Sequence, residues 1–195
     1  MVINYMSAHD NNTLWDKLLL SNPTHTDEQR NAMNKLGAAI LMISKGTPFW
    51  QAGEEMLRTK DGDENSYKSP DKINNMDWSK LKRNSLQYKT MNYYRGLIEM
   101  RSELSIFRCD DTLIHAQSLA NRAVILTYDD NNGGKAKVVI NARGKDFHIS
   151  FGEEWLLITD EEKAGSTPFK REASATVRAI SMRVYINEHL AEKLK

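Results

Sequence analysis

The first half of the chain alternates between short β-prone runs and longer stretches with helical spacing. Val2–Met6 is a β-prone run that leads directly into a polar cluster at residues 9–12. The order of polar residues from Thr26 to Gln29 matches a capping box. An apolar stripe at helical spacing follows, formed by Met33, Leu36, Ile40 and Leu41. These patterns predict a strand, then a helix of about four to five turns that ends at Gly46.

A second strand and a second helix are predicted after Gly46. Thr47–Gln51 has the composition of a short strand, and a long polar segment follows at residues 58–77. Ordinary connections run about 2 to 6 residues, so a polar loop of this length is typical of a functional segment. The helix that follows has one apolar face, formed by Met91, Tyr94, Leu97, Ile98 and Leu104. The region therefore reads as two consecutive βα units.

Beyond about Phe107 the helical spacing gives way to short β-branched and aromatic runs separated by turn residues. Asp129–Gly134 is the clearest turn. The predicted strands are 122–128, 137–141, 147–151, 155–159 and 175–186. This pattern predicts an antiparallel β-sandwich over residues 107–195, preceded by an α/β region over residues 1–106. The charged segment 187–195 is interpreted as a solvated terminus.

The amino-acid composition gives no support for several classes of partner. Lys and Arg number 27 and Asp and Glu number 26 among 195 residues, so charge gives no basis for binding nucleic acid or an anionic membrane. No apolar run approaches the roughly 20 residues that span a bilayer. The N-terminus has neither the basic nor the apolar region of a secretory signal, which leaves the cellular location unknown. Cys109 is the one cysteine, so no intrachain disulfide is expected, and we interpret it as a packing thiol.

The candidate chemistry begins at His9 and Asp10. A polar cluster at the end of a strand, followed by a second strand with a long loop, is how α/β barrels position active-site groups. The alternative is a turn in which Asp10 or Asn12 caps the next segment. Asp61, Asp63 and Asn65 have the spacing that begins a calcium loop, but the later positions of that motif do not match. The histidine spacing does not suggest zinc, and no phosphate-binding loop or nucleophile elbow is present, so neither a metal nor a cofactor is expected.

Three ordered segments resemble a known enzyme family. Asn4–Lys17 resembles the fourth signature region of the α-amylase superfamily, in the form found in type I pullulanases of glycoside hydrolase family 13. Gly46–Glu55 is similar to the eighth barrel strand and its continuation, and Arg58–Asp71 with Asn74–Trp78 is similar to the loop that follows that strand. Weaker similarity continues through Tyr94–Ile98, Arg101 and Val138–Asn141.

The resemblance implies a fold and a set of site residues. It implies that residues 1–106 are the last two βα units of a TIM-type (β/α)8 barrel, strands 7 and 8 with their helices, and that residues 107–195 are a C-terminal β-sandwich domain. Asp10 matches the carboxylate that stabilises the transition state, and His9 matches a neighbouring residue that binds sugar hydroxyls. Four loop residues are further candidates for sugar contacts, although pairing among themselves is an equally good interpretation: Arg58, Asp63, Asn65 and Tyr67.

The resemblance also implies an activity and its partners. The family hydrolyses α-1,6-glucosidic linkages in pullulan, starch or glycogen with two further carboxylates, a nucleophile Asp and an acid/base Glu. These are expected upstream of Met1, so we expect the chain alone to be inactive. Its expected partners are an α-glucan and the N-terminal remainder of the barrel, and its open barrel edges suggest self-association.

Two other function classes remain open from the sequence. One is a noncatalytic carbohydrate-binding or structural module. Its stacking platforms would be among the four tryptophans, for each of which core packing is the alternative: Trp15, Trp50, Trp78 and Trp155. The other is a protein-interaction module, which only the open barrel edges would favour.

Overall fold

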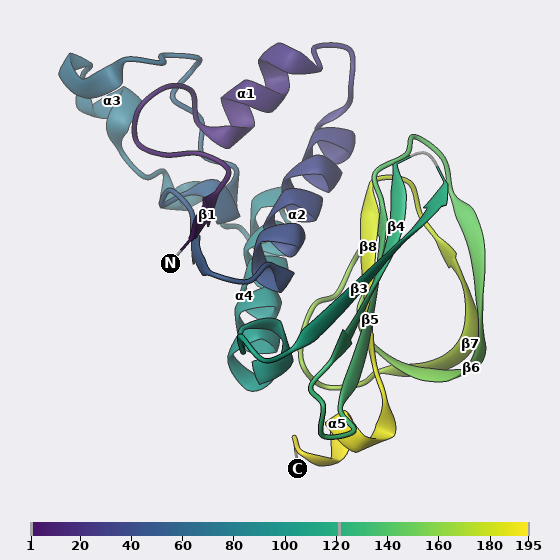
Figure 1. The fold of residues 1–195 in the computed structure, drawn as a ribbon. Coiled ribbons are helices and arrows are strands. Elements are labelled where there is room, and N and C mark those ends of the chain that lie inside the picture. Colours follow the sequence, from purple (N-terminus) through teal and green to yellow (C-terminus); the bar gives the residue numbers. More distant parts are fainter. Residues whose placement is uncertain (1, 121, 195) are drawn as a thin grey trace.

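A pair of short parallel strands forms the start of the fold. The structure is a computed structural model that describes residues 2–120 and 122–194. Strand β1 (Ile3–Tyr5) pairs in parallel with β2 (Thr47–Phe49). Helices α1 (Leu14–Ser21) and α2 (Asp27–Ile43) connect the two strands (Figure 1). The predicted strand–helix–strand order is confirmed, with α1 as an additional helix that the sequence pattern did not predict.

Local capping explains where these helices begin. The capping box before α2 is present as predicted: the Thr26 hydroxyl accepts a hydrogen bond from the Gln29 N–H, and the Gln29 side chain accepts one from the Thr26 N–H. The unpredicted α1 is capped by Thr13, whose hydroxyl accepts a hydrogen bond from the Asp16 N–H at 3.1 Å. Its eight residues are too few to show a clear apolar period.

The segment between β2 and the next long helix is a loop with short turns of helix. It contains three 3-10 turns and the short helix α3 (Asp71–Asn74). The 3-10 turns are η1 (Glu54–Met56), η2 (Ser66–Lys68) and η3 (Trp78–Lys80). Helix α4 (Leu86–Glu103) follows, and after it η4 (Ser105–Phe107). The predicted long loop and second helix are therefore confirmed.

The second half is a six-stranded sheet with the order β3-β4-β5-β8-β6-β7, in which every neighbouring pair is antiparallel. Its strands are β3 (Leu113–Ala120), β4 (Ala123–Asp129), β5 (Lys135–Asn141), β6 (Phe147–Thr159), β7 (Lys170–Val177) and β8 (Ser181–Ile186). The predicted antiparallel region is confirmed, but its strand boundaries differ. Residues 147–159 form one strand whose pairing is irregular between Ser150 and Trp155, and residues 175–186 belong to two strands.

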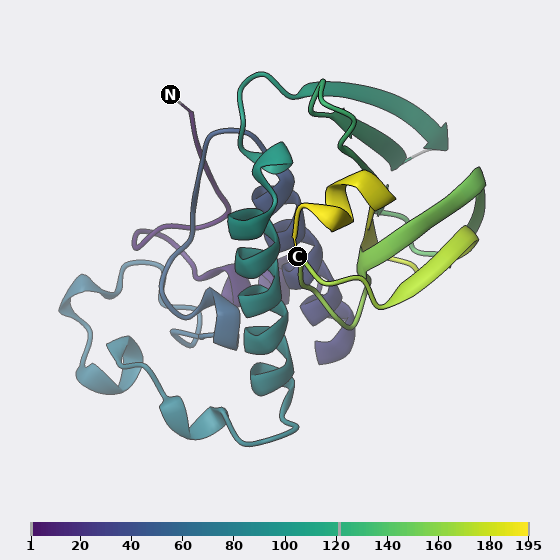
Figure 2. The same cartoon turned by 90° about the horizontal axis from the view of Figure 1, so that it is seen from below.

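Two hydrophobic cores lie on the two faces of this sheet. One face packs against α2 and α4, where Leu97 and Met100 meet Val184 and Ile186. The other face encloses a smaller core around Val139, Trp155 and Tyr185. The sheet curves so that β6 and β7 turn away from β3 and β4 (Figures 1 and 2). The helical part and the sheet therefore share the larger core.

Several side chains lie differently from the sequence-based expectation. Cys109 is exposed, so its interpretation as a packing thiol is wrong. The charged C-terminal segment forms helix α5 (Glu188–Glu192), and Leu190 is only 5% exposed because it packs into the shared core. Ile40 and Ile98, assigned to the apolar faces of their helices, are both exposed.

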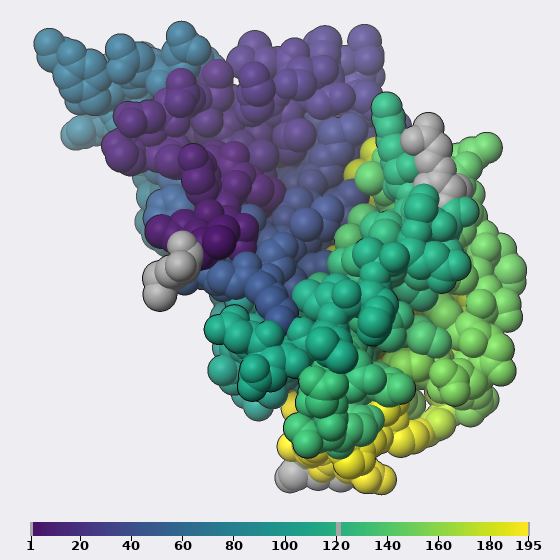
Figure 3. Space-filling view, viewed as in Figure 1, coloured from purple at the N-terminus to yellow at the C-terminus, as the bar shows by residue number. Residues whose placement is uncertain are grey.

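The strands at the N-terminus leave apolar side chains open to water. Val2, Ile3, Tyr5 and Phe49 are all exposed, although residues of these types are usually buried. The space-filling view shows the purple N-terminal segment at the surface of the molecule (Figure 3). In the described part of the chain β1 and β2 pair only with each other, which is unusual because parallel strands normally lie inside larger sheets.

Arg101 joins the ends of three elements. Its guanidinium donates hydrogen bonds to the carbonyl oxygens of Met42, Ser44 and Phe107 at 2.7 to 3.1 Å, and to that of Gly46 at 2.8 Å. Carbonyls at a helix C-terminus lack partners within the helix, and a buried cation satisfies them. Arg101 thereby fixes the end of α2 and the start of β2 against α4.

A buried hydrogen-bond network connects the segments that follow β1 and β2 to α2 and α4. The Ser7 hydroxyl donates to the Glu54 carboxyl, and the Gln51 N–H donates to the same oxygen at 3.2 Å. The Asn34 side chain donates to the Glu54 carbonyl oxygen at 3.4 Å and accepts a hydrogen bond from the Tyr94 hydroxyl at 2.8 Å. Burial raises the pKa of the Glu54 carboxyl from its ordinary 4.5 to about 7.

The contact between α4 and the loop that connects β6 and β7 predicts an effect of substituting Gly96. A Cβ at Gly96 would lie 2.0 Å from the Ala164 carbonyl oxygen, so Gly96→Ala forces the two segments apart. Alanine normally stabilises a helix relative to glycine. Here we expect the free energy of unfolding, measured by chemical denaturation, to fall by about 2 kcal/mol. At Gly144, where a Cβ meets open space, Gly144→Ala should change it by less than about 0.5 kcal/mol. Equal effects of the two substitutions would contradict the close contact.

The raised pKa of Glu54 predicts a pH dependence of stability. Between the ordinary and raised pKa values the folded state binds more protons than the unfolded state, so stability falls as pH rises from 4.5 to about 7. Glu54→Gln remains neutral and lacks this loss. We expect the free energy of unfolding of the variant, relative to that of the parent, to be higher at about pH 8 than at about pH 4 by on the order of 3 kcal/mol. Chemical denaturation of both proteins at the two pH values measures this difference. Parallel pH profiles of the two proteins would contradict this assignment.

Candidate functional site

His9 and Asp10 lie in the turn that follows β1. Their side chains are 87% and 82% exposed, and His9 Nε2 lies 3.4 Å from Asp10 Oδ1. Asn11 adopts a left-handed backbone conformation with φ of 65°, which asparagine tolerates better than most residues. The alternative that Asp10 or Asn12 caps the next helix is wrong, because Thr13 is the cap of α1.

Hydrogen bonds connect the turn and the start of α1 to the first residues of the long loop. Asp16 of α1 is buried, and its carboxylate accepts hydrogen bonds from the Thr59 hydroxyl at 2.5 Å and the Lys60 N–H at 2.8 Å. The Lys60 ammonium donates to the Ser66 hydroxyl at 2.7 Å and to the His9 carbonyl oxygen at 3.4 Å. Two segments about 50 residues apart in the chain are therefore held together by charge-assisted hydrogen bonds.

Asp63 and Asn65 lie in the loop and are hydrogen-bonded to each other. Asp63 Oδ1 accepts a hydrogen bond from the Asn65 N–H at 3.0 Å, and Oδ2 accepts one from the Ser69 hydroxyl at 2.5 Å. The Ser69 hydrogen bond is the main reason that the pKa of Asp63 lies below its usual range. The Asp63 carboxylate therefore organises the turn itself, whereas the Asn65 side chain caps no helix.

Arg58 and Tyr67 have different surroundings. The Arg58 guanidinium is half-buried and donates to the carbonyl oxygens of Asn74 and Ala52. Tyr67 is 75% exposed, and the Lys68 ammonium lies 5.1 Å from the centre of its ring. Arg58 thus supports the loop, while Tyr67 offers an accessible aromatic side chain.

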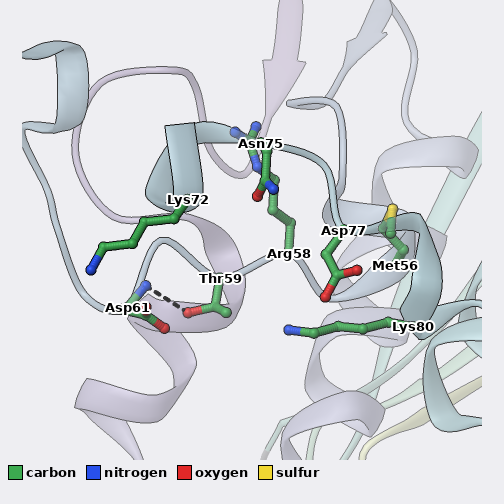
Figure 4. A pocket seen from close by; sticks show the side chains of 8 residues that line it. All are labelled: Met56, Arg58, Thr59, Asp61, Lys72, Asn75, Asp77 and Lys80. Carbon is green, nitrogen blue, oxygen red and sulfur yellow. Dashed lines mark hydrogen bonds between the residues drawn. The ribbon is translucent and has the colours of Figure 1, made fainter. Parts of the chain in front are cut away.

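A polar cavity of about 200 Å³ is lined by side chains of segment 56–80, which contains this loop (Figure 4). Both donors and acceptors line it, since positive and negative side chains are mixed. The Asp61 N–H donates to the Thr59 hydroxyl at 2.9 Å, and a hydrogen bond from the Ser79 hydroxyl lowers the pKa of Asp77. The lining residues are Met56, Arg58, Thr59, Asp61, Lys72, Asn75, Asp77 and Lys80.

The structure connects the His9–Asp10 turn to the loop through Lys60 and not through the predicted residues themselves. Among residues 2–120 and 122–194, no hydrogen bond or ion pair joins Asp10 to the four candidate loop residues. In the same described part, no group of three or more His, Cys, Asp or Glu side chains is arranged to hold a metal ion. The described helices are also too short or too polar to cross a bilayer.

Sequence reasoning missed the residues that position the turn. They are Asp16, Lys60, Ser66 and Asn74. Asp16 stands three residues after Thr13, which predicts only a helix start. The burial of Lys60 left no signal, because a lysine in a polar segment is expected to be exposed.

Comparison with known proteins gives relatives that include several pullulanases and an isoamylase. No family model matches the chain. The pullulanase of Bacillus subtilis strain 168 is 34% identical over 166 residues, which cover 81% of this chain and 22% of that protein. The solved pullulanase from Bacillus acidopullulyticus has a TM-score of 0.86 and 29% identity over 95% of this chain and 24% of that one. A pullulanase from Anoxybacillus sp. LM18-11, solved with maltotriose, has a TM-score of 0.80 and 28% identity over 95% of this chain and 27% of that one.

The matches cover most of this chain but only about a quarter of each matched protein. It extends over both the helical part and the antiparallel sheet, since the solved structures cover 95% of the chain. The chain spans between 22% and 27% of the length of these three proteins. The protein is therefore homologous to the C-terminal part of pullulanases.

Proposed function

We propose that this chain supplies the transition-state-stabilising carboxylate, Asp10, to a pullulanase-type enzyme that hydrolyses α-1,6-glucosidic linkages in pullulan, starch or glycogen. The observation that carries the proposal is the exposed His9–Asp10 turn, held against loop 58–77 in a chain homologous to pullulanases. The relative solved with maltotriose supports an α-glucan as the ligand.

The proposal includes the domain organisation. Residues 1–106 would be barrel strands 7 and 8 with their helices, and residues 107–195 would be a C-terminal β-sandwich domain. The parallel pairing of β1 and β2 across α1 and α2 supports the first assignment. The curved antiparallel sheet, with a core on its inner face, supports the second.

In the proposed reaction, this chain would contribute stabilisation of the transition state. Hydrogen bonds from ring hydroxyls to Asp10 and His9 that strengthen as the sugar ring flattens would lower the barrier. Retaining hydrolysis also needs a nucleophile and an acid/base carboxylate, which the remainder of the barrel would supply. Tyr67 would stack on a sugar ring, while the internal hydrogen bonds of Arg58, Asp63 and Asn65 favour a supporting role beside any sugar contact.

The exposed strands are the proposed contact with the rest of the barrel. The strand edges would form hydrogen bonds with neighbouring strands, and the exposed apolar side chains would pack against them. Without that partner, the same surface would favour association between copies of this chain.

A second candidate function is a noncatalytic carbohydrate-binding module. Tyr67 and Trp78, which are 75% and 63% exposed, favour it because accessible aromatic rings stack on sugars. The other tryptophans do not: Trp155 is buried, Trp50 packs edge-on against Tyr94 at 5.3 Å, and Trp15 is half-buried. Binding of the chain alone to glycogen, lost on Trp78→Ala, would favour this second candidate.

The purified chain is expected not to hydrolyse pullulan or branched dextrins. Asp10 alone can stabilise charge but cannot attack the anomeric carbon and protonate the leaving group at once. The measurement is release of reducing ends by the 195-residue chain. Turnover that disappears on Asp10→Asn would contradict the proposed division of the catalytic groups.

A chimera tests the role of Asp10 directly. This chain replaces the region of the Bacillus subtilis pullulanase that it matches, and kcat on pullulan is measured. We expect Asp10→Asn to lower kcat by about 10³-fold, because the removed charge acts mainly in the transition state. Asp110→Asn, at an exposed acid in the turn after η4, is the matched control and should leave kcat unchanged. Equal activity of the two variants would refute the assignment.

A further inference from the structure

Lys60 is a buried lysine whose ammonium forms no ion pair in the described part of the chain, although its charge contributes to the lowered pKa of the Asp63 carboxyl. Only 6% of the residue is exposed, and the two hydrogen-bond acceptors of its ammonium are a hydroxyl and a carbonyl. Burying an ammonium is costly, and even a paired buried charge contributes little net stability to a fold. Fold stability alone therefore does not account for a lysine at this position.

The contacts of Lys60 come from three separate segments. Asp16 of α1 holds the Lys60 backbone N–H at 2.8 Å. The ammonium then reaches His9 in the turn after β1 and Ser66 at the start of η2. With its backbone anchored on a helix, the side chain connects the turn and the loop at a fixed position.

The hydrogen bonds continue from Ser66 into the loop. The Ser66 hydroxyl donates to Asn74 Oδ1 at 2.9 Å, and Asn74 Nδ2 donates to the carbonyl oxygens of Ser66 and Ser69 at 2.7 and 3.1 Å. The Ser69 hydroxyl in turn donates to Asp63. The position of the ammonium is therefore set by much of the 63–74 segment.

The carbonyl that Lys60 contacts belongs to the peptide group between His9 and Asp10. This group is planar, so holding its oxygen also restricts the position of the Asp10 nitrogen and Cα. We propose that Lys60 is a positioning residue that orients the exposed Asp10 carboxylate relative to loop 58–77. The role in catalysis rests on the proposed function, whereas the link between loop and turn can be tested without it.

The kinetic test uses the chimera described above. Lys60→Met keeps the side-chain volume and removes the charge, and we expect kcat per active site to fall by about 100-fold because Asp10 is displaced by about 1 Å. KM should stay within about threefold of the parent value, since Asp10 acts mainly in the transition state. Lys82→Met, at an exposed lysine outside the site, is the matched control and should behave like the parent. A parent-like kcat for Lys60→Met would overturn the proposal.

A spectroscopic test uses the isolated chain. We expect Lys60→Met to shift the amide resonances of residues 9–11 and to leave those of α4 and β8 unchanged, because the ammonium contacts His9 and Ser66. Lys82→Met should leave residues 9–11 unshifted. Unmoved resonances at residues 9–11 in Lys60→Met would overturn the proposal even if the chimera is active. An inactive parent chimera would instead refute the proposed function, and the resonances would still decide whether Lys60 holds the turn.

Discussion

The shared hydrophobic core between α4 and the antiparallel sheet supports the rest of the structure. Two parallel strands of three residues each cannot bury enough apolar surface to fold alone. They are held because α2 and α4 pack on one face of the six-stranded sheet, with Gly96 allowing close approach of the Ala164 backbone. Arg101 then ties the end of α2 and the start of β2 to α4. The antiparallel sheet therefore supports the pair of short parallel strands through the two helices.

The proposed site depends on this support through polar contacts. Glu54 and Ser7 hold the end of β1, and Asp16 and Lys60 hold the turn that follows it against the long loop. Buried polar groups of this kind contribute specificity of position when all their partners are present. The His9 and Asp10 side chains stay exposed while their backbone is restrained, which suits groups that must meet a ligand in a fixed geometry.

The sequence determined the order and type of most elements. The capping box at Thr26, the long polar segment and the turn at Asp129–Gly134 each have a local cause, so the pattern of residues was sufficient to predict them. It was insufficient for α1, whose eight residues are too few to show an apolar period, and for β3 and the continuity of β6 across Ser150–Trp155, which depend on pairing with other strands. The resemblance to pullulanases also came from local motifs, in particular Asn4–Lys17 and Gly46–Glu55.

Only the tertiary structure decided which polar residues support the site. A lysine at position 60 and an aspartate at position 16 look like ordinary solvated charges in the sequence, because burial arises from segments far away in the chain. For the same reason the sequence could not distinguish Arg58 and Asp63, which are hydrogen-bonded within the loop, from the exposed Tyr67. Chemical type is encoded residue by residue, but exposure and partners result from contacts across the whole fold.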